Sequence, residues 1–370
     1  MSERLVDWNL AERIACTIAG EGPAWLGAGE AELRRESDRA IEIVSDYTGL
    51  RARTEIPPAE LVTREEWVDS SIKSFQEISA ELERELIERS QMPSGIGRRL
   101  GAAATGVEVG LATGYLAQKV VGQYDVALFG PARSPRLLFV APNLAAARQR
   151  LGAEPEPFLH WIALHEGTHA LQFAAVPWLR EHIGGLAREL LTKASLDVKT
   201  SDVLSKLVGL GPRGISEAVR RGDLANLFWT QPQMELVDQL TAAMTVVEGY
   251  AEHVMDAAAS EMGEGVEDLR ESLEKDRGSR GTLDQVVARL LGLDAKLAQY
   301  RRGKAFCDQV VEAGGIDTLN RVWRSAEDLP TLSEIDQPLS WIDRVGASRL
   351  PRIHPVRSLR RLILRRTSTA

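Results

Sequence analysis

Two histidines and a glutamate near the middle of the chain form the pattern H-E-x-x-H, at His165, Glu166 and His169. Residues four apart lie on one face of an α-helix, so both imidazoles can reach one metal ion. In proteins with this pattern the two histidines bind zinc and the glutamate acts as a general base. Apolar residues surround the motif and no proline falls between positions 158 and 176, which favours a helix. The alternative is a core helix with two ordinary histidines.

A catalytic zinc usually has three protein ligands and one open position, so the motif requires a partner from elsewhere in the chain. The pattern H-E-x-x-H-x-x-G-x-x-H is excluded because positions 172 and 175 are glutamine and alanine. The best candidate is Glu248, which stands among apolar residues in a strongly helical stretch. A buried carboxylate is costly without a counter-charge, and a metal ion would supply one. The alternative is an acidic stripe on the surface of an amphipathic helix.

Two acidic residues are predicted to support this metal site. Glu252 and Asp256 follow Glu248 at helical spacing, and each can accept the second ring N–H of a ligating histidine. His253 lies about 140° around the helix from Glu248 and is not predicted to take part.

Hydrolysis at such a site also requires a hydrogen-bond donor for the tetrahedral oxyanion. We predict Tyr300 for that role, with Tyr250 as the second candidate. The alternative for either tyrosine is a residue of the core or of the rim of the site.

The composition of the 370-residue chain is that of a soluble globular protein: 44% hydrophobic, 26% charged and 5% aromatic. Cys16 and Cys307 lie far apart, which indicates neither a disulfide framework nor a thiolate metal site. The net charge of −8 argues against a nucleic-acid-binding body. The N-terminus has no long apolar segment typical of a signal peptide, so we expect a cytoplasmic location.

A basic segment ends the chain: from Arg349 onwards there are seven arginines and no acidic residue. It can bind an anionic partner, or be a solvated or back-docking tail. We predict a single domain over residues 1–348, with the metal-site core at about 100–345, followed by this tail at 349–370.

Apolar spacing predicts a mainly α fold with a small antiparallel sheet. Two strands, 124–129 and 136–141, are expected to form a hairpin that precedes the histidine helix by one short helical segment. A peptide ligand can add to the edge of such a sheet, or the strand pair only covers the core. Thr63 and Glu66 are predicted to form a capping box. Helices are predicted at 4–19, 29–48, 63–91, 143–151, 177–208, 232–262, 279–291 and 294–313.

The apolar stretch 100–121 has two interpretations. It is long enough to span a membrane, but it carries Glu108 and Lys119 and many small residues, so we predict a core helix. Gly106, Gly110 and Gly114 lie four apart and would let another helix approach closely.

These motifs together resemble known families. The first motif, followed far downstream by Glu248-Gly249-x-Ala251-Glu252, is similar to the gluzincin arrangement of zinc metallopeptidases. Over roughly residues 100–345 the chain also resembles an actinobacterial-type family of predicted zinc hydrolases associated with biosynthesis of a deazaflavin coenzyme. Segments 122–125, 139–143 and 300–306 contribute to this second resemblance. The resemblance implies a zincin-like fold, a zinc cofactor, and His165, His169 and Glu248 as its ligands.

Three classes of function follow from the sequence. The leading hypothesis is a zinc-dependent hydrolase, specifically a metallopeptidase acting on a peptide or protein substrate. The second is a zincin-like metal-binding interaction or regulatory protein without proteolytic activity. The third is an amide hydrolase of a small molecule. An intact Glu166 beside an open metal position favours the two enzymes.

Overall fold

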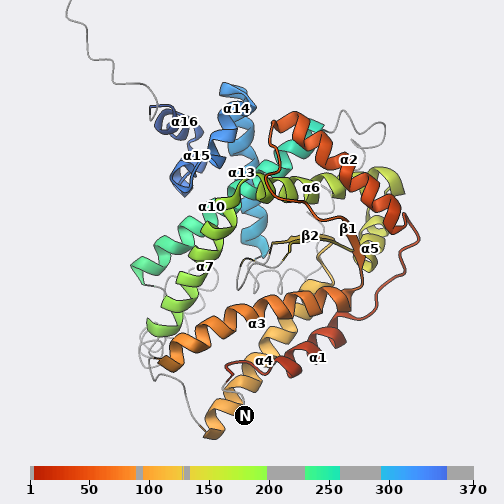
Figure 1. Ribbon diagram of the computed structural model, residues 1–370, viewed down its shortest axis with the longest axis vertical. Coiled ribbons are helices and arrows are strands. Elements are labelled where there is room, and N and C mark those ends of the chain that lie inside the picture. The colour runs from red at the N-terminus through yellow and green to blue at the C-terminus, as the bar shows by residue number, and fades with distance from the viewer. Residues whose placement is uncertain are drawn as a thin grey trace, which may run out of the picture.

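The computed structural model describes residues 4–88, 95–126, 128, 134–197, 230–258 and 293–347. In these ranges the chain is mainly helical, as predicted (Figure 1). The predicted helix 279–291, the end of 177–208 and the tail 349–370 lie outside the described residues. The elements are α1 (Trp8–Ala19), α2 (Glu30–Thr48), α3 (Arg64–Glu88), α4 (Gly95–Ala117), α5 (Ala141–Leu151), α6 (Pro155–Ala175), α7 (Pro177–Asp197), α10 (Gln231–Ala258), α13 (Leu293–Gly314), α14 (Ile316–Leu319), η2 (Asn320–Trp323), η3 (Ala326–Asp328), α15 (Leu332–Asp336) and α16 (Pro338–Ala347).

A three-stranded sheet lies at the centre, with strand order β1-β3-β2. β2 (Gly122–Asp125) and β3 (Arg136–Val140) pair antiparallel, which confirms the predicted strand pair with shorter strands. β1 (Ala59–Val62) pairs with β3 in parallel, so the sheet is mixed and not purely antiparallel as predicted. β1 was not predicted, because a four-residue strand that includes Glu60 shows too little of an alternating pattern.

The sheet separates two hydrophobic cores. Leu137 and Phe139 pack in the larger core with residues of α2, α6 and α10, whereas Leu138 and Val140 pack with α1, α3 and α4. This alternation follows from the two-residue period of a strand. Figure 1 shows the strands between α2 and α6 on one side and α1, α3 and α4 on the other. Because both faces of β3 are covered, all four of these side chains are fully buried.

Helices α1 and α4 cross at close range along a row of glycines. A Cβ atom on Gly106, Gly110 or Gly114 would come within 2.7 to 2.8 Å of atoms of α1 or of Asp7 just before it. The predicted close helix approach is therefore confirmed, and α1 is the helix that uses it.

The opposite face of α4 is exposed, so the prediction of a core helix holds for one face only. Leu100 and Leu111 on that face are 67% and 50% exposed. Among the described residues, no helix is long and apolar enough to cross a membrane.

Helix α3 begins as predicted from the capping box. The backbone N–H of Thr63 donates to Glu66 Oε2 at 2.7 Å, and the backbone N–H of Glu66 donates to Thr63 Oγ1 at 3.1 Å. These two bonds satisfy donors that a helix N-terminus otherwise leaves unpaired.

Helices α10 and α13 also cross at close range, through two facing glycines. A Cβ atom on Gly249 would lie 2.1 Å from the carbonyl carbon of Gly303. Neither position can carry a larger residue without separating the helices. Since Gly249 follows Glu248 directly, this crossing fixes the backbone that carries that carboxylate.

Candidate metal centre

Helix α6 carries the two histidines of the motif on one face. Their Nε2 atoms lie 3.2 Å apart, and the rings stand nearly perpendicular, with centroids 4.6 Å apart. The helix is buried over most of its length, and Pro155 at its first position is well suited to a helix start. The histidine side chains keep partial exposure, 24% for His165 and 12% for His169, so the cluster is reachable from one side.

Helix α10 brings Glu248 to the two histidines, although 79 positions separate residues 169 and 248. Glu248 Oε2 lies 3.4 Å from His169 Nε2 and 3.8 Å from His165 Nε2. Glu248 is 9% exposed, and its helix neighbours Val246 and Val247 belong to the core. The structure therefore brings the three predicted ligands together from two helices.

The spacing of these donors fits a tetrahedral metal ion. Ligand atoms at about 2.0–2.1 Å from a tetrahedral zinc lie roughly 3.3 Å from one another. The separations here, 3.2, 3.4 and 3.8 Å, bracket that value. The set of two imidazoles and one carboxylate is also one that catalytic zinc uses. Among the described residues, His165, His169 and Glu248 are the group whose ligand atoms all lie within 4.8 Å of one another.

Glu166 is buried beside the cluster and in contact with the sheet. It is 6% exposed, and a Cβ atom on Gly122 would lie 2.5 Å from Glu166 Cγ and 2.7 Å from its Oε1. A side chain at position 122 would therefore force the Glu166 side chain to shift. The first residue of β2 therefore limits the positions that the Glu166 side chain can adopt.

The Nδ1 atoms of the two histidines contact Gln172 and Met255, which were not predicted to support the metal site. Gln172 Oε1 lies 2.9 Å from His169 Nδ1, and Gln172 Nε2 donates to the Val247 carbonyl at 3.0 Å. Met255 Sδ lies 3.2 Å from His165 Nδ1. Gln172 thus connects the α6 ligand to the α10 backbone. The signal in the sequence for this contact is the position of Gln172, three residues after His169 and about one helical turn away.

The two acidic residues predicted to support the site lie further along α10. Asp256 forms an ion pair with Lys304 of α13 at 2.8 Å, and Glu252 is half-buried one turn after Glu248. Their predicted support of a ligating histidine stays a prediction.

The charge of Glu248 changes the protonation of its neighbour. Burial alone would lower the pKa of His169, but the Glu248 carboxylate, with smaller contributions from Glu166 and Gln172, raises that pKa from 6.5 to about 9. At neutral pH the metal-free cluster therefore binds a proton on His169. This positive charge occupies the place where a metal cation would balance the carboxylate.

The two candidate oxyanion donors differ in the structure. The side chain of Tyr300 lies outside the described residues, so its role stays a prediction. The Tyr250 hydroxyl donates to Asn320 Oδ1 at 2.8 Å, and its ring packs against Trp323. Burial raises the pKa of Tyr250. Tyr250 is therefore a core residue whose hydroxyl is already bonded away from the ligand cluster.

A second polar cluster lies on another side of α10 and joins α2, α10 and α13. His253 bonds to the Tyr47 hydroxyl through Nε2 and to Asp308 Oδ1 through Nδ1, both at 2.7 Å. Lys304 lies 2.5 Å from Asp308 Oδ2 and 2.8 Å from Asp256 Oδ2. The prediction that His253 points away from the metal ligands agrees with this placement.

This arrangement defines the zincin class of site. One helix carries two histidines and a glutamate, a second helix supplies the third ligand, and a short sheet lies beside the first helix. The chain belongs to the zincin-like metallopeptidase family, whose model matches residues 6–342. The match extends over the N-terminal helices as well as the predicted core.

The chain is also similar to a protein of known structure, described as "a putative hydrolase with a novel fold" from Chloroflexus aurantiacus. The two are 32% identical, with a TM-score of 0.64 over 94% of this chain and 100% of the other. Among curated proteins, no match is found.

Proposed function

We propose that the protein is a zinc-dependent hydrolase that cleaves peptide bonds, with zinc held by His165, His169 and Glu248. The observation that carries this proposal is the convergence of three ligand atoms, at tetrahedral spacing, beside the buried carboxylate of Glu166. Membership of the zincin-like metallopeptidase family supports the same class of reaction.

The residues of the site divide the chemistry between them. When bound, zinc supplies a Lewis acid that polarises the substrate carbonyl and lowers the pKa of the attacking water. Glu166 accepts the proton of that water and delivers it to the leaving amine as the C–N bond breaks. Gln172 holds the orientation of His169 through its Nδ1 contact. Tyr300 is our candidate for the donor to the oxyanion.

The position of β2 favours a peptide as substrate. β2 is an edge strand of the described sheet, with β3 as its neighbour, and its first residue contacts Glu166. An extended peptide that adds to such an edge makes main-chain hydrogen bonds that do not depend on its sequence. A peptide paired with β2 would therefore run past the general base.

Zinc content and peptide cleavage together test the proposal. We expect one zinc per chain in the native protein and in Glu166→Gln, and loss of most zinc in Glu248→Ala after mild chelation and dialysis. Cleavage of a peptide library should fall at least about 100-fold in Glu166→Gln, because the general base is lost. The matched control is Glu156→Gln, an exposed glutamate of the same helix, which should retain both zinc and activity.

Three results would contradict the proposal. A native protein that takes up no zinc after resupply has no metal site of this kind. Zinc binding without cleavage of any peptide, but with hydrolysis of small amides, would assign the site to metabolite chemistry. Zinc binding without any hydrolysis would leave a metal-binding module.

A further inference from the structure

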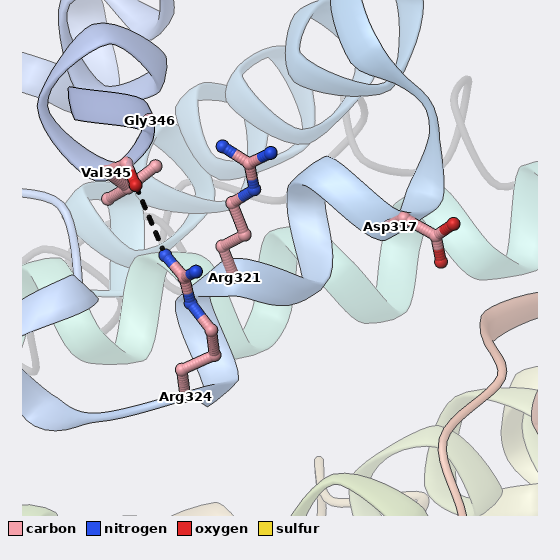
Figure 2. A pocket seen from close by; sticks show the side chains of 5 residues that line it. All are labelled: Asp317, Arg321, Arg324, Val345 and Gly346. Carbon is pink, nitrogen blue, oxygen red and sulfur yellow. Dashed lines mark hydrogen bonds between the residues drawn. The ribbon is translucent and has the colours of Figure 1, made fainter. Parts of the chain in front are cut away.

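A cavity lies near the C-terminal end of the described chain, on elements that supply no metal ligand. It has a volume of about 310 Å³ and is lined by Asp317, Arg321, Arg324, Val345 and Gly346. Figure 2 shows the two arginine side chains rising from η2 and the residue after it toward the end of α16. Asp317 lies across the cavity, and its carboxylate points away from both guanidinium groups.

Arg324 is held in place by its neighbours. Its Nε lies 3.2 Å from Asp328 Oδ2, and its terminal nitrogen donates to the Val345 carbonyl at 3.4 Å. The side chain is 25% exposed, so most of it is packed. These contacts fix the direction of the guanidinium and still leave donors that face the cavity.

Arg321 differs from Arg324 because its guanidinium is not engaged. Among the described residues it makes no hydrogen bond or ion pair, yet the residue is only half exposed. Gly346 leaves space beside it, since a Cβ atom there would lie 3.6 Å from an Arg321 guanidinium nitrogen. A guanidinium has five N–H donors, and a partly buried one with none of them used is suited to an oxyanion.

The sequence that follows the cavity residues is positively charged, as are the two arginines of the cavity. The chain continues from α16 into a segment with seven arginines and no acidic residue. Repulsion between like charges disfavours that segment as the occupant of a cavity lined by two arginines. An anionic small molecule is therefore favoured over the chain's own tail as the ligand.

We propose that this cavity binds a phosphate group, held between the guanidinium groups of Arg321 and Arg324. Arg321 offers its guanidinium donors to the cavity, Arg324 offers those that its contacts with Asp328 and Val345 leave, and the planar forks of both suit the oxygens of a phosphate. The cavity is larger than one phosphate ion, so the ligand can carry an organic group beside the phosphate. This site does not depend on the metal centre.

Calorimetric titration of the full chain tests the proposal, with inorganic phosphate and glycerol phosphate as probes. A site with a Kd near 1 mM would fill at probe concentrations of about 10 mM. Arg321→Gln should weaken binding about tenfold or more, because charge-assisted bonds are lost. Arg321→Lys should weaken it less, since it keeps the charge without the fork. The control is Arg39→Gln, which removes an exposed arginine from α2 and should leave binding unchanged.

Each arm of the experiment has a decisive outcome. Tighter binding of glycerol phosphate than of inorganic phosphate identifies a phosphorylated small molecule as the ligand, and equal binding identifies free phosphate. Absence of binding overturns the proposal. Binding that is the same in Arg321→Gln also overturns it, because the anion would then be held elsewhere, for example by the arginines after position 348. Zinc content should be native in every variant.

Discussion

Helix α10 carries two polar clusters that are built differently. On one side, Glu248 Oε2 lies 3.4 Å from His169 Nε2 and 3.8 Å from His165 Nε2. On another side, His253 bonds to Tyr47 and to Asp308, whose second oxygen is bonded to Lys304. Both clusters combine histidine with carboxylate, but Glu248 is buried whereas the Asp308 side chain is 42% exposed.

The difference between the two clusters lies in the source of their positive charge. The His253 cluster contains its own cation, Lys304, whose pKa is raised by Asp256 and Asp308 against the effect of burial. In the Glu248 cluster, the carboxylate raises the pKa of His169, so a proton on His169 supplies positive charge, and a metal ion would supply it in place of that proton. One cluster is therefore balanced by a lysine, whereas the other can exchange a proton for a metal ion.

The largest expected effect separates the two clusters by mutation. His253→Ala should lower the free energy of unfolding by about 2–4 kcal/mol, because Tyr47 and Asp308 lose a buried partner. Zinc content should stay at the native level, in contrast to Glu248→Ala. Chemical denaturation and elemental analysis of both variants check this. If the His253→Ala variant is fully folded and yet loses zinc, the two clusters are coupled.

A smaller effect is expected where helices cross through glycines. Gly249→Ala should cost about 1–3 kcal/mol, because α13 must move away from α10, and it should also weaken zinc binding by displacing Glu248. The matched variant is Gly110→Ala, at the crossing of α1 and α4, where a Cβ atom would lie 2.7 Å from the Ala11 carbonyl oxygen. It should cost similar stability.

Zinc affinity, measured by competition with a chelator, distinguishes these two variants. Gly249→Ala should bind zinc about tenfold more weakly than native protein, and Gly110→Ala should bind it equally well. Equal affinity in both would mean that the α10–α13 crossing has no part in placing the ligand.

A third expected effect is on the pH dependence of stability. The pKa of His169 is raised from 6.5 to about 9 in the folded metal-free protein. This histidine therefore adds about 3 kcal/mol of stability that is fully present below pH 6.5 and is lost as pH rises through 9. With zinc bound, the metal replaces the proton and this dependence should disappear. Denaturation at pH 6, 7.5 and 9, with and without chelator, measures it.

A matched variant makes the origin of the pH effect clear. His169→Gln removes the titrating ring, so its metal-free stability should vary less between pH 6.5 and 9 than that of native protein. If native protein with zinc and native protein without zinc show the same dependence, another group is responsible.

The sequence was sufficient to predict features that depend on local spacing. His165 and His169 four apart, the Thr63–Glu66 capping box and the glycine row of α4 are each contained in one helix, where 3.6 residues per turn fixes the geometry. The identity of α1 as the partner of that glycine row required the structure.

Features that depend on pairing between distant segments could not be predicted. The contact of Gly122 with Glu166 and the meeting of Gly249 with Gly303 join segments whose separate sequences show no reason to be neighbours. Met255 reached His165 through a side-chain conformation that spacing does not determine. Glu248 was found only because a carboxylate in an apolar stretch requires a counter-charge.

The distance along the chain between the metal ligands has a consequence for unfolding. An ion held by His165, His169 and Glu248 is a removable cross-link between positions 169 and 248, and it closes a long loop in any chain that keeps it bound. A covalent cross-link around a loop of this size restricts the unfolded chain by about 4 kcal/mol. The bond here is reversible, because acid returns the proton to His169. The same three side chains would thus determine both the reactivity of the protein and the strength of the link between α6 and α10.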